Sequence, residues 1–238
     1  MATYIIADIH GCYDQYMELL HRINFGSEDE LYILGDVVDR GPEPIKIILD
    51  IMDRDNVTLI MGNHEVMALA VLKKLVREIS HGSIEDFDYD VMQEISLWMA
   101  NGGDITMEKF QQLDPSKRAD VLSYLEDASY YETIEQDDKL YVLVHGGLGG
   151  FSLDKDLDDY DLDDLVWERP DYDREYFPGG RVFLVTGHTP TQFIRYDRKP
   201  LIFQENGHIA IDCGCAFGGN LAAYCVETGE VTYVEGVR

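Results

Sequence analysis

Hydrophobic and polar positions follow two different periods along the chain, and the change of period marks its elements. Short apolar runs bounded by turn residues predict buried strands, whereas apolar residues three and four positions apart predict amphipathic helices. The pattern therefore indicates a mixed α/β (α+β) protein with helices between its first strands. Strands are predicted at 4–7, 31–35, 57–61, 131–135, 140–144, 182–185, 201–205, 208–212, 221–226 and 231–234.

Strands and helices alternate in the first part of the chain. Apolar positions at helical spacing predict a helix over 13–24, and Pro42 and Pro44 open a second helix. A third helix is expected over 66–79. The first three strands should therefore form two βαβ units with parallel strands.

The stretch 83–129 keeps a helical pattern between two predicted strands. We interpret it as a helical cap inserted into one domain that spans 1–238. If this cap is only a lid, the sheets should fold without it. Trp98, Met99 and Phe110 either line a substrate cleft or form the cap's own core.

A hairpin and an acidic loop are expected in the second half. Asn206-Gly207 is a strong type I′ turn signal, and His208 beside it is expected to be exposed and without a role. Residues 154–164 hold seven Asp in eleven positions. They lack the glycine and glutamate that a calcium loop needs at its sixth and twelfth positions, so a solvated loop is predicted.

Composition limits the classes of partner. The 238 residues are 45% hydrophobic and carry a net charge of −27. No basic stripe is present, so we expect neither duplex nucleic acid nor an anionic membrane as partner. The same charge should repel anionic substrates unless a local site reverses the field. The oligomeric state is left open.

Compartment is inferred from apolar runs and cysteines. No apolar run reaches the roughly 20 residues needed to span a bilayer, and no signal peptide is expected. The four cysteines, Cys12, Cys213, Cys215 and Cys225, show no disulfide-framework spacing and no zinc-site spacing. We expect free thiols in a cytoplasmic protein.

Five predicted strands end in side chains that bind metals. Ligands bind in the crevice at the carboxyl ends of parallel strands, so these side chains should converge. Such ligands suit two borderline-to-hard divalent ions, and ions about 3.5–4 Å apart assist displacement at phosphorus and generate hydroxide near neutral pH. The residues are Asp8, His10, Asp36, Asn63, His145 and His188.

The motifs around these residues resemble the phosphoprotein phosphatase (PPP) family of calcineurin-like metallophosphoesterases. Small bacterial and phage serine/threonine phosphatases and symmetrical diadenosine tetraphosphatases belong to it. The resemblance implies a β-sandwich flanked by helices, with the site at one edge. The cap segment 98–106 and the tail 211–214 are similar to bacterial members. The motifs are Asp8-Ile9-His10-Gly11, Gly35-Asp36-Val37-Val38-Asp39-Arg40-Gly41, Gly62-Asn63-His64-Glu65, His145-Gly146-Gly147 and Gly187-His188-Thr189-Pro190.

The resemblance implies two metal sites that share one carboxylate. The shared ligand would be Asp36, and Mn²⁺ is the expected metal, with Fe or Zn as alternatives. Glu65 receives no role beyond support of its turn. The first metal would be held by Asp8, His10 and Asp36, and the second by Asp36, Asn63, His145 and His188.

The resemblance also implies the catalytic residues. Arg40, Asn63 and Arg169 would bind the phosphoryl oxygens, where guanidinium groups suit bidentate contacts. The assignment of Arg169 depends on a short local signature, Trp-Glu-Arg. His64 would be the general acid for the leaving oxygen, and Asp39 would hold its other ring nitrogen.

Three functions remain open at this point. The first is a serine/threonine-type protein phosphatase that hydrolyses phosphomonoesters by direct attack of metal-bound hydroxide, on phosphoproteins or small phosphorylated substrates. The second is a symmetrical bis(5'-nucleosyl)-tetraphosphatase, which would need a basic pocket. The cap offers few basic residues, so the first is favoured. The third, an inactive scaffold, predicts a missing ligand or acid, and none is missing.

Overall fold

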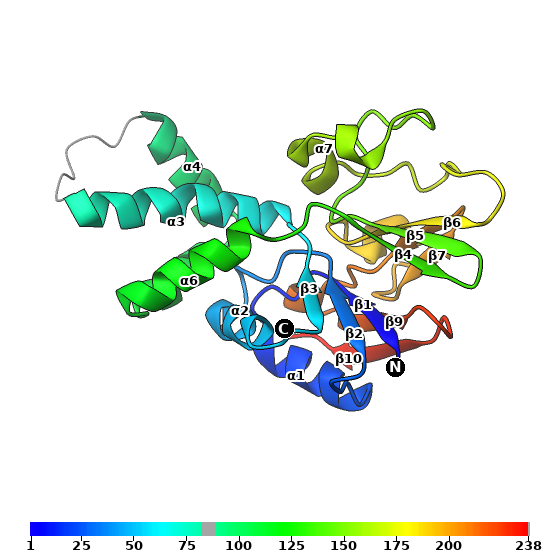
Figure 1. Cartoon of the computed structure of the whole chain (residues 1–238), viewed down its shortest axis with the longest axis horizontal. Coiled ribbons are helices and arrows are strands. Elements are labelled where there is room, and N and C mark those ends of the chain that lie inside the picture. Colours follow the sequence, from blue (N-terminus) through cyan, green and yellow to red (C-terminus); the bar gives the residue numbers. More distant parts are fainter. Residues whose placement is uncertain (82–88, 238) are drawn as a thin grey trace.

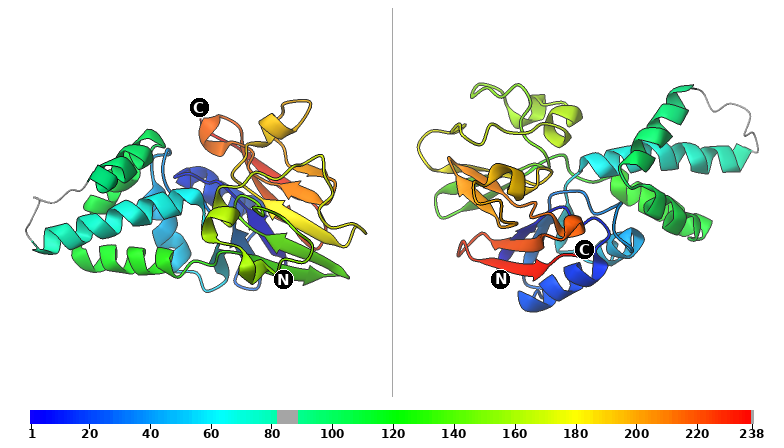
Figure 2. Two further views of the ribbon diagram at one scale, coloured as in Figure 1. Left: turned by 90° about the horizontal axis from the view of Figure 1, so that it is seen from above. Right: turned by 180° about the vertical axis from the view of Figure 1, so that it is seen from behind.

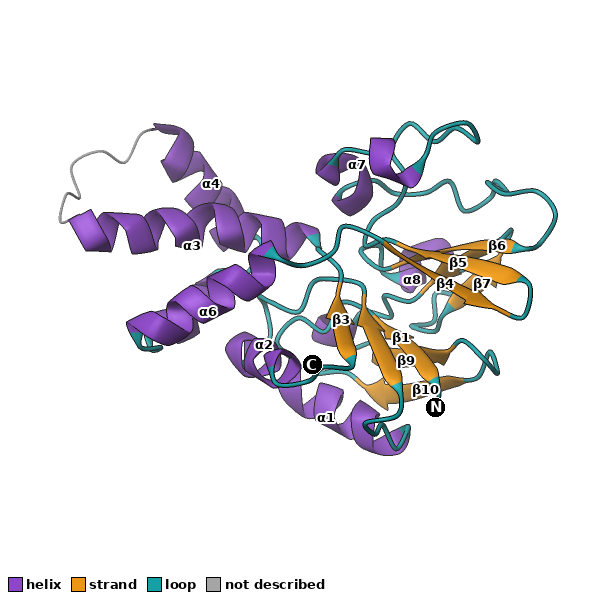
Figure 3. Cartoon of the chain, viewed as in Figure 1, coloured by secondary structure: helices purple, strands orange, loops and turns teal. Residues whose placement is uncertain are grey.

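The computed structural model describes residues 1–81 and 89–237, and it contains two five-stranded sheets. Figures 1 and 3 show the strands stacked in two layers, with helices on their outer sides. Side chains from both sheets form one buried apolar layer between them, which includes Ile5, Leu34, Leu143 and Val185. The predicted sandwich flanked by helices is therefore confirmed.

The first sheet has the strand order β10-β9-β1-β2-β3. Strands β1, β2 and β3 are parallel, as the βαβ pattern predicts, and helices α1 and α2 connect them. Strands buried on both faces read as continuous apolar runs, which is why the sequence signals them clearly. The bounds are β1 Thr3–Ile6, α1 Tyr13–Arg22, β2 Glu30–Ile33, α2 Pro44–Met52, β3 Val57–Leu59, β9 Asn220–Cys225 and β10 Val231–Glu235.

The second sheet has the strand order β4-β5-β6-β8-β7, and β5, β6 and β8 are parallel. The predicted hairpin turn at Asn206-Gly207 is present, with φ of 53° and 75° at its two residues. Positive φ at both central positions is what a type I′ turn requires. The bounds are β4 Glu132–Gln136, β5 Lys139–Leu143, β6 Val182–Thr186, β7 Phe203–Glu205 and β8 His208–Ala210.

The helical segment expected over 83–129 is present, although its residues 83–88 lie outside the described part of the chain. Figures 1 and 2 show α3, α4 and α6 extending to one side of the sandwich. The segment is nevertheless continuous with the core beneath the first sheet, because its residues Trp98, Phe110 and Leu125 belong to the same buried cluster as Ile48. The bounds are α3 Asn63–His81, α4 Tyr89–Ala100, α5 Asp104–Gln111 and α6 Pro115–Glu126.

Short helices complete the loops that join the strands of the second sheet and lead back to the first. The acidic loop begins with a 3₁₀ turn, η1, and runs into α7, where Lys155 Nζ lies 3.2 Å from a carboxylate oxygen of Asp164. All four cysteines are free and buried. Within the described ranges, no helix has the length and apolar character of a membrane span. The bounds are η1 Leu157–Asp159, α7 Leu162–Val166, α8 Thr191–Ile194 and η2 Cys215–Phe217.

Two local expectations are wrong. Helix α3 begins at Asn63 rather than at residue 66, because Glu65 accepts a hydrogen bond from the N–H of Gly62 and so caps the helix start. His208 is buried rather than exposed. Its ring packs against Tyr172 and Tyr176, and Nε2 lies 2.8 Å from the carbonyl oxygen of Arg174.

Candidate functional site

The turns that follow the parallel strands of both sheets meet at one edge of the sandwich. Several contacts cross between the sheets, and in one of them the N–H of His188, after β6, donates to Asp8, after β1, at 3.0 Å. In the same way, His145 Nε2, after β5, lies 2.9 Å from Asn63 Oδ1, after β3. The five strand ends that the sequence singles out are therefore brought together.

Much of the backbone at this edge is left-handed, a conformation that costs free energy for residues other than glycine. The backbone adopts this conformation because it turns sharply after each parallel strand, which directs a side chain toward the common centre. The sequence gives no signal for it, although Asp tolerates this conformation better than most residues. The residues and φ angles are Asp8 52°, His10 45°, Asp36 54°, Asp39 70°, Arg40 67° and His188 62°.

Asp36 lies at the centre of the cluster. Its Oδ2 is 3.5 Å from His10 Nε2, and its Oδ1 is 3.4 Å from His145 Nε2, so each oxygen faces a different imidazole. Burial by itself would raise the pKa of Asp36, but the neighbouring imidazoles of His145, His64 and His10 hold it below its ordinary value. The carboxylate therefore lies between two groups of imidazole nitrogens.

Two imidazoles are fixed in orientation by backbone carbonyl groups. Nδ1 of His10 lies 2.9 Å from the oxygen of Val38, and Nδ1 of His145 lies 2.6 Å from that of Leu34. A ring that donates from Nδ1 has its Nε2 lone pair free for a metal. Burial lowers the pKa of both histidines, which favours the neutral form that binds metals.

Asn63 and His188 complete the second group. His188 Nδ1 lies 2.9 Å from Asn63 Oδ1, and within the described part of the chain its buried Nε2 has no hydrogen-bond partner. Burial, followed by the charge of His145, lowers the pKa of His188 to about 3. Nδ1 of His188 and Nε2 of His145 therefore converge on the same amide oxygen, an arrangement that a cation between them would satisfy.

Among the described residues, two compact sets of possible ligands share Asp36. One set is His10, Asp36 and His64, and the other is Asp36, His145 and His188; the ligand atoms of each lie within 4.8 Å of one another. Neither set contains Asp8 or a residue of the acidic loop.

Asp8 lies beside these sets in a crowded anionic environment. Burial, followed by the charges of Asp212 and Asp36, raises its pKa. Burial likewise raises the pKa of Asp212 to about 7. We assigned no role to Asp212 from the sequence, although it follows β8 just as the other residues follow their strands. Three buried carboxylates in one place favour bound cations because their mutual repulsion then falls.

The guanidinium of Arg40 stands over this cluster. It donates to His10 Nε2 and, at 2.9 Å, to His64 Nε2. Its carbon lies 4.9 Å from the ring centre of Phe217, an exposed residue of η2. The group therefore carries a positive charge at the mouth of the site, next to the imidazole of His64.

His64 and Asp39 form a buried pair. His64 Nδ1 lies 2.6 Å from Asp39 Oδ2, so the ring donates to the carboxylate and presents Nε2 to the site. Burial lowers the pKa of His64, but Asp36 and the bond to Asp39 outweigh it and the net shift is upward. Two cap side chains, Trp98 and Thr106, also bond to Asp39.

Glu65 holds the turn that carries Asp36. One oxygen accepts hydrogen bonds from the N–H groups of Asp36, at 2.7 Å, and Gly62, and the other accepts from Val37 and Val38. The spacing Gly-x-x-Glu before an apolar run is typical of a helix cap and could have indicated part of this role.

Arg169 lies at the outer margin of the site. Its side chain is exposed, and its charge contributes to lowering the pKa of His188 after burial and His145. Together with Thr189 and the aromatic residues Tyr172 and Phe193 it lines a hollow of about 330 Å³. The structure therefore places Arg169 beside the cluster rather than inside it.

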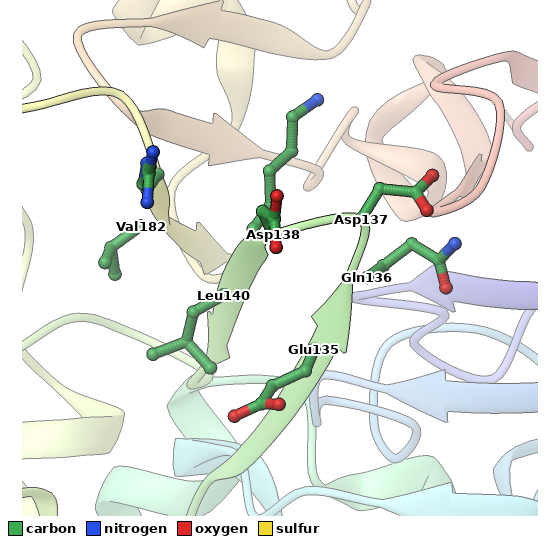
Figure 4. A pocket seen from close by; sticks show the side chains of 8 residues that line it. Glu135, Gln136, Asp137, Asp138, Leu140 and Val182 are labelled. Atoms are coloured by element: carbon green, nitrogen blue, oxygen red, sulfur yellow. The ribbon is translucent and has the colours of Figure 1, made fainter.

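Another hollow, of about 420 Å³, is remote from this edge. Figure 4 shows its labelled side chains on the β4–β5 hairpin and at Val182. It lies where β5 and β6 begin, whereas His145 and His188 follow the ends of these strands. With a rise of about 3.3 Å per residue, the strands separate the two places by their full length.

One curated relative matches a large stretch of the chain. Over 150 residues, the chain is 31% identical to the symmetrical bis(5'-nucleosyl)-tetraphosphatase of Nitrosomonas europaea. The match covers 62% of this chain and 45% of that protein, so the chain spans less than half the length of this relative.

Two solved structures share the fold over the whole chain. One is provisionally described as a diadenosine tetraphosphatase; it has a TM-score of 0.68 at 20% identity, and the match covers 94% of it. The other is a protein serine/threonine phosphatase from Saccharomyces cerevisiae with similarity to human phosphatase PP5; it has a TM-score of 0.63 at 16% identity, with 81% covered. These likenesses concern the fold.

The family assignment comes from the whole length of the chain. The model of calcineurin-like phosphoesterases matches residues 1–234, a range that contains every residue of the cluster described above. The chain therefore belongs to the calcineurin-like phosphoesterase family.

Proposed function

We propose that this protein is a phosphoesterase that uses two divalent metal ions to hydrolyse phosphomonoesters, with phosphoproteins as the first candidate substrates. The observation that carries the proposal is the position of Asp36, whose two oxygens face two different imidazoles. A carboxylate shared in this way is suited to bridge two cations. A guanidinium and a buried imidazole–carboxylate pair lie next to it.

The donor set fits two such ions. Imidazole nitrogens, carboxylates and an amide oxygen suit Mn²⁺, Fe²⁺ or Zn²⁺, and the convergence of His145 Nε2 and His188 Nδ1 on Asn63 Oδ1 supports the assignment. When bound, the ions would polarise the phosphoryl group and supply a nucleophilic oxygen near neutral pH. We assign Asp8, His10 and Asp36 to the first ion, and Asp36, Asn63, His145 and His188 to the second.

The chain's own cations would bind the phosphoryl group. Arg40 is in place, because its guanidinium already lies within hydrogen-bond distance of His64 Nε2. Arg169 is exposed at the margin and can reach toward the centre, and Asn63 would contribute its amide group. Planar guanidinium groups bind phosphoryl oxygens in bidentate fashion, which fixes the group for in-line displacement.

His64 would deliver the proton to the leaving oxygen. Its Nδ1 is engaged by Asp39, so Nε2 is the nitrogen that faces the site. In the structure Arg40 donates to this atom at 2.9 Å. The position of His64 between the cluster and the guanidinium supports an acid role, and the bond to Asp39 stabilises its protonated form.

The charges around the site support a monoester. A tetraphosphate carries about four negative charges, and such a chain needs several free cations. Lys73 of α3 and Lys109 of the cap lie within ion-pair distance of carboxylates, Lys73 of Glu126 at 2.5 Å and Lys109 of Glu43 at 3.4 Å. Two carboxylates, those of Asp171 and Asp173, line the hollow beside Arg169.

A second candidate is symmetrical hydrolysis of dinucleoside tetraphosphates. It is supported by the name of the relative from Nitrosomonas europaea. It is also supported by the aromatic residues Tyr172, Phe193 and Phe203 in the hollow beside Arg169, since such rings can stack on a nucleobase. The third possibility, an inactive scaffold, is disfavoured because every expected ligand is brought to one edge.

Parallel turnover tests the proposal. A phosphoserine peptide, p-nitrophenyl phosphate and diadenosine tetraphosphate would be compared at saturating Mn²⁺, with Asp36→Asn as the inactive control. We expect phosphate release from the first two and slower cleavage of the third. Faster production of ADP from the tetraphosphate would favour the second candidate, and no metal-dependent turnover of any substrate would overturn both.

A further inference from the structure

Two side chains of the cap bind the carboxylate that orients His64. Asp39 is completely buried and accepts three hydrogen bonds from side chains. One comes from His64, at 2.6 Å. The other two come from Trp98 Nε1, at 2.9 Å, and from Thr106 Oγ1, at 2.7 Å. Two of the three donors that fix this carboxylate therefore belong to α4 and α5, not to the sheets.

Thr106 holds Asp39 at two points. Its hydroxyl donates to Asp39 Oδ1 and accepts from the backbone N–H of Asp39 at 2.9 Å. The hydroxyl therefore closes a small ring that fixes the side chain relative to its own backbone. This matters because Asp39 has a φ of 70°, a conformation that needs external support.

The loop between α4 and α5 supports the same turn. The N–H of Arg40 donates to the carbonyl oxygen of Gly102 at 3.0 Å. A Cβ on Gly102 would approach Arg40 Cγ to 2.9 Å, and one on Gly103 would approach the ring of Trp98 to 2.5 Å. Glycines at these two positions thus let the cap lie directly on the turn and leave room for the indole.

The bonds to Asp39 bear on proton delivery. A buried carboxylate is stable only when its oxygens accept hydrogen bonds, and the positions of the donors set its orientation. Oδ2 accepts from both His64 and Trp98, while Oδ1 accepts from Thr106. If a cap donor is removed, the carboxylate can rotate and His64 loses its fixed partner.

We propose that Trp98 and Thr106 are positioning residues, which act through Asp39 to hold His64 in the orientation needed to protonate the leaving oxygen. The inference rests on the proposed phosphoesterase function. The cap then contributes to the chemical step itself, and it does so without contacting the substrate through these two residues.

The first test uses leaving-group dependence. Thr106→Val removes the hydroxyl with almost the same shape, Thr106→Ser retains it, and Trp98→Phe removes the indole N–H. Phe110→Leu, in the same buried cluster, is the control for loss of packing. The turnover of an alkyl phosphate needs a proton on the leaving oxygen, whereas that of p-nitrophenyl phosphate does not.

We expect Thr106→Val and Trp98→Phe to lower turnover of the alkyl phosphate about tenfold or more, the effect of losing a hydrogen bond to a charged group. The loss on p-nitrophenyl phosphate should be no more than about threefold, because little proton transfer is needed there. Thr106→Ser should restore the alkyl phosphate rate, and Phe110→Leu should affect both substrates alike. Equal losses on the two substrates for Thr106→Val would overturn the inference.

The second test does not depend on turnover. In the Zn²⁺-loaded protein, which is diamagnetic, the proton on His64 Nδ1 should give a downfield NMR signal because it lies in a short bond to a carboxylate. His64→Asn assigns this signal by removing it. Thr106→Val and Trp98→Phe should shift or broaden it, whereas Thr106→Ser and Phe110→Leu should not.

The two failures are distinguishable. If the wild-type protein hydrolyses neither phosphate ester, the proposed function is wrong, while the NMR signal still reports on the bonds to Asp39. If the wild-type protein hydrolyses both esters but Thr106→Val leaves the signal and the substrate preference unchanged, only the positioning role is wrong.

Discussion

At the level of single residues, the site depends on which partner each polar atom of a side chain contacts. Asp36 offers one oxygen to each imidazole group, and His10 and His145 direct Nδ1 to carbonyl oxygens so that Nε2 faces the site. Each of these side chains is buried, so a change to any one leaves its partners without compensation.

Asp36→Asn should weaken binding of both metal ions, because the amide can offer neither a negative charge nor two equivalent oxygens. His188→Ala should mainly affect the second ion, since the group around His10 stays intact. Elemental analysis of Mn²⁺-loaded and desalted protein measures both effects, with the exposed Asp55→Asn as control. Retention of two ions per chain in Asp36→Asn would contradict the bridging assignment.

His64→Asn should leave both metals bound and lower turnover of an alkyl phosphate by about 10²–10⁴-fold, the usual effect of losing a general acid. The loss on p-nitrophenyl phosphate should be clearly smaller. Asp39→Asn should show the same order in milder form, because it removes only the group that orients the ring. Steady-state rates of both variants on both substrates test this role. Equal losses on the two substrates would mean that His64 does not protonate the leaving oxygen.

At the scale of elements, the start of α3 is where helix and site are joined. The first residues of this helix are Asn63, His64 and Glu65, so one helical turn supplies an expected metal ligand, the expected acid and the support of the Asp36 turn. The close approach requires glycine: a Cβ on Gly62 would lie 2.5 Å from the backbone nitrogen of Asp36.

Glu65→Gln should destabilise this junction. The carboxylate accepts from four backbone N–H groups, whereas the amide of Gln has one accepting oxygen and would turn donors toward donors. We expect the free energy of unfolding to fall by about 1–3 kcal/mol. Urea unfolding measures it, with the exposed Glu205→Gln as the matched control. An unchanged midpoint would show that water or other groups replace the carboxylate.

At the scale of the whole molecule, the cap is part of the main core. Trp98, Phe110, Val121 and Leu125 are at most 2% exposed, and they lie in the same cluster as residues of α1 and α2. We therefore propose one domain in which the cap cannot be separated from the sheets, rather than a lid on an independent sandwich.

Replacing residues 83–127 by a short Gly-Ser linker should therefore destabilise the protein, because the faces beneath the cap become exposed. We expect a lower melting temperature and binding of a hydrophobic dye, two signs of exposed apolar surface. Phe110→Ala should lower the free energy of unfolding by about 3–5 kcal/mol, which indicates how much one buried side chain of the cap contributes. A monodisperse truncated protein that still binds two metal ions would contradict the proposal and restore the lid interpretation.

The strands, the βαβ order and the residues at the strand ends could all be predicted from the amino-acid sequence alone. These features are local. A buried parallel strand appears in the sequence as an apolar run, and the residue that follows the run must lie at the end of the strand. The apolar pattern places the start of α3 three residues too late, because Asn63, His64 and Glu65 carry no apolar signal.

Contacts between side chains that are far apart in the sequence could not be predicted in this way. Trp98 and Thr106 lie 59 and 67 residues from Asp39 in the sequence, and His208 is buried by a loop more than 30 residues earlier. A periodic pattern tells which face of an element is buried, but not which distant side chain it packs against. That contact depends on how whole elements pack, and through it the cap came to hold the Asp39 carboxylate.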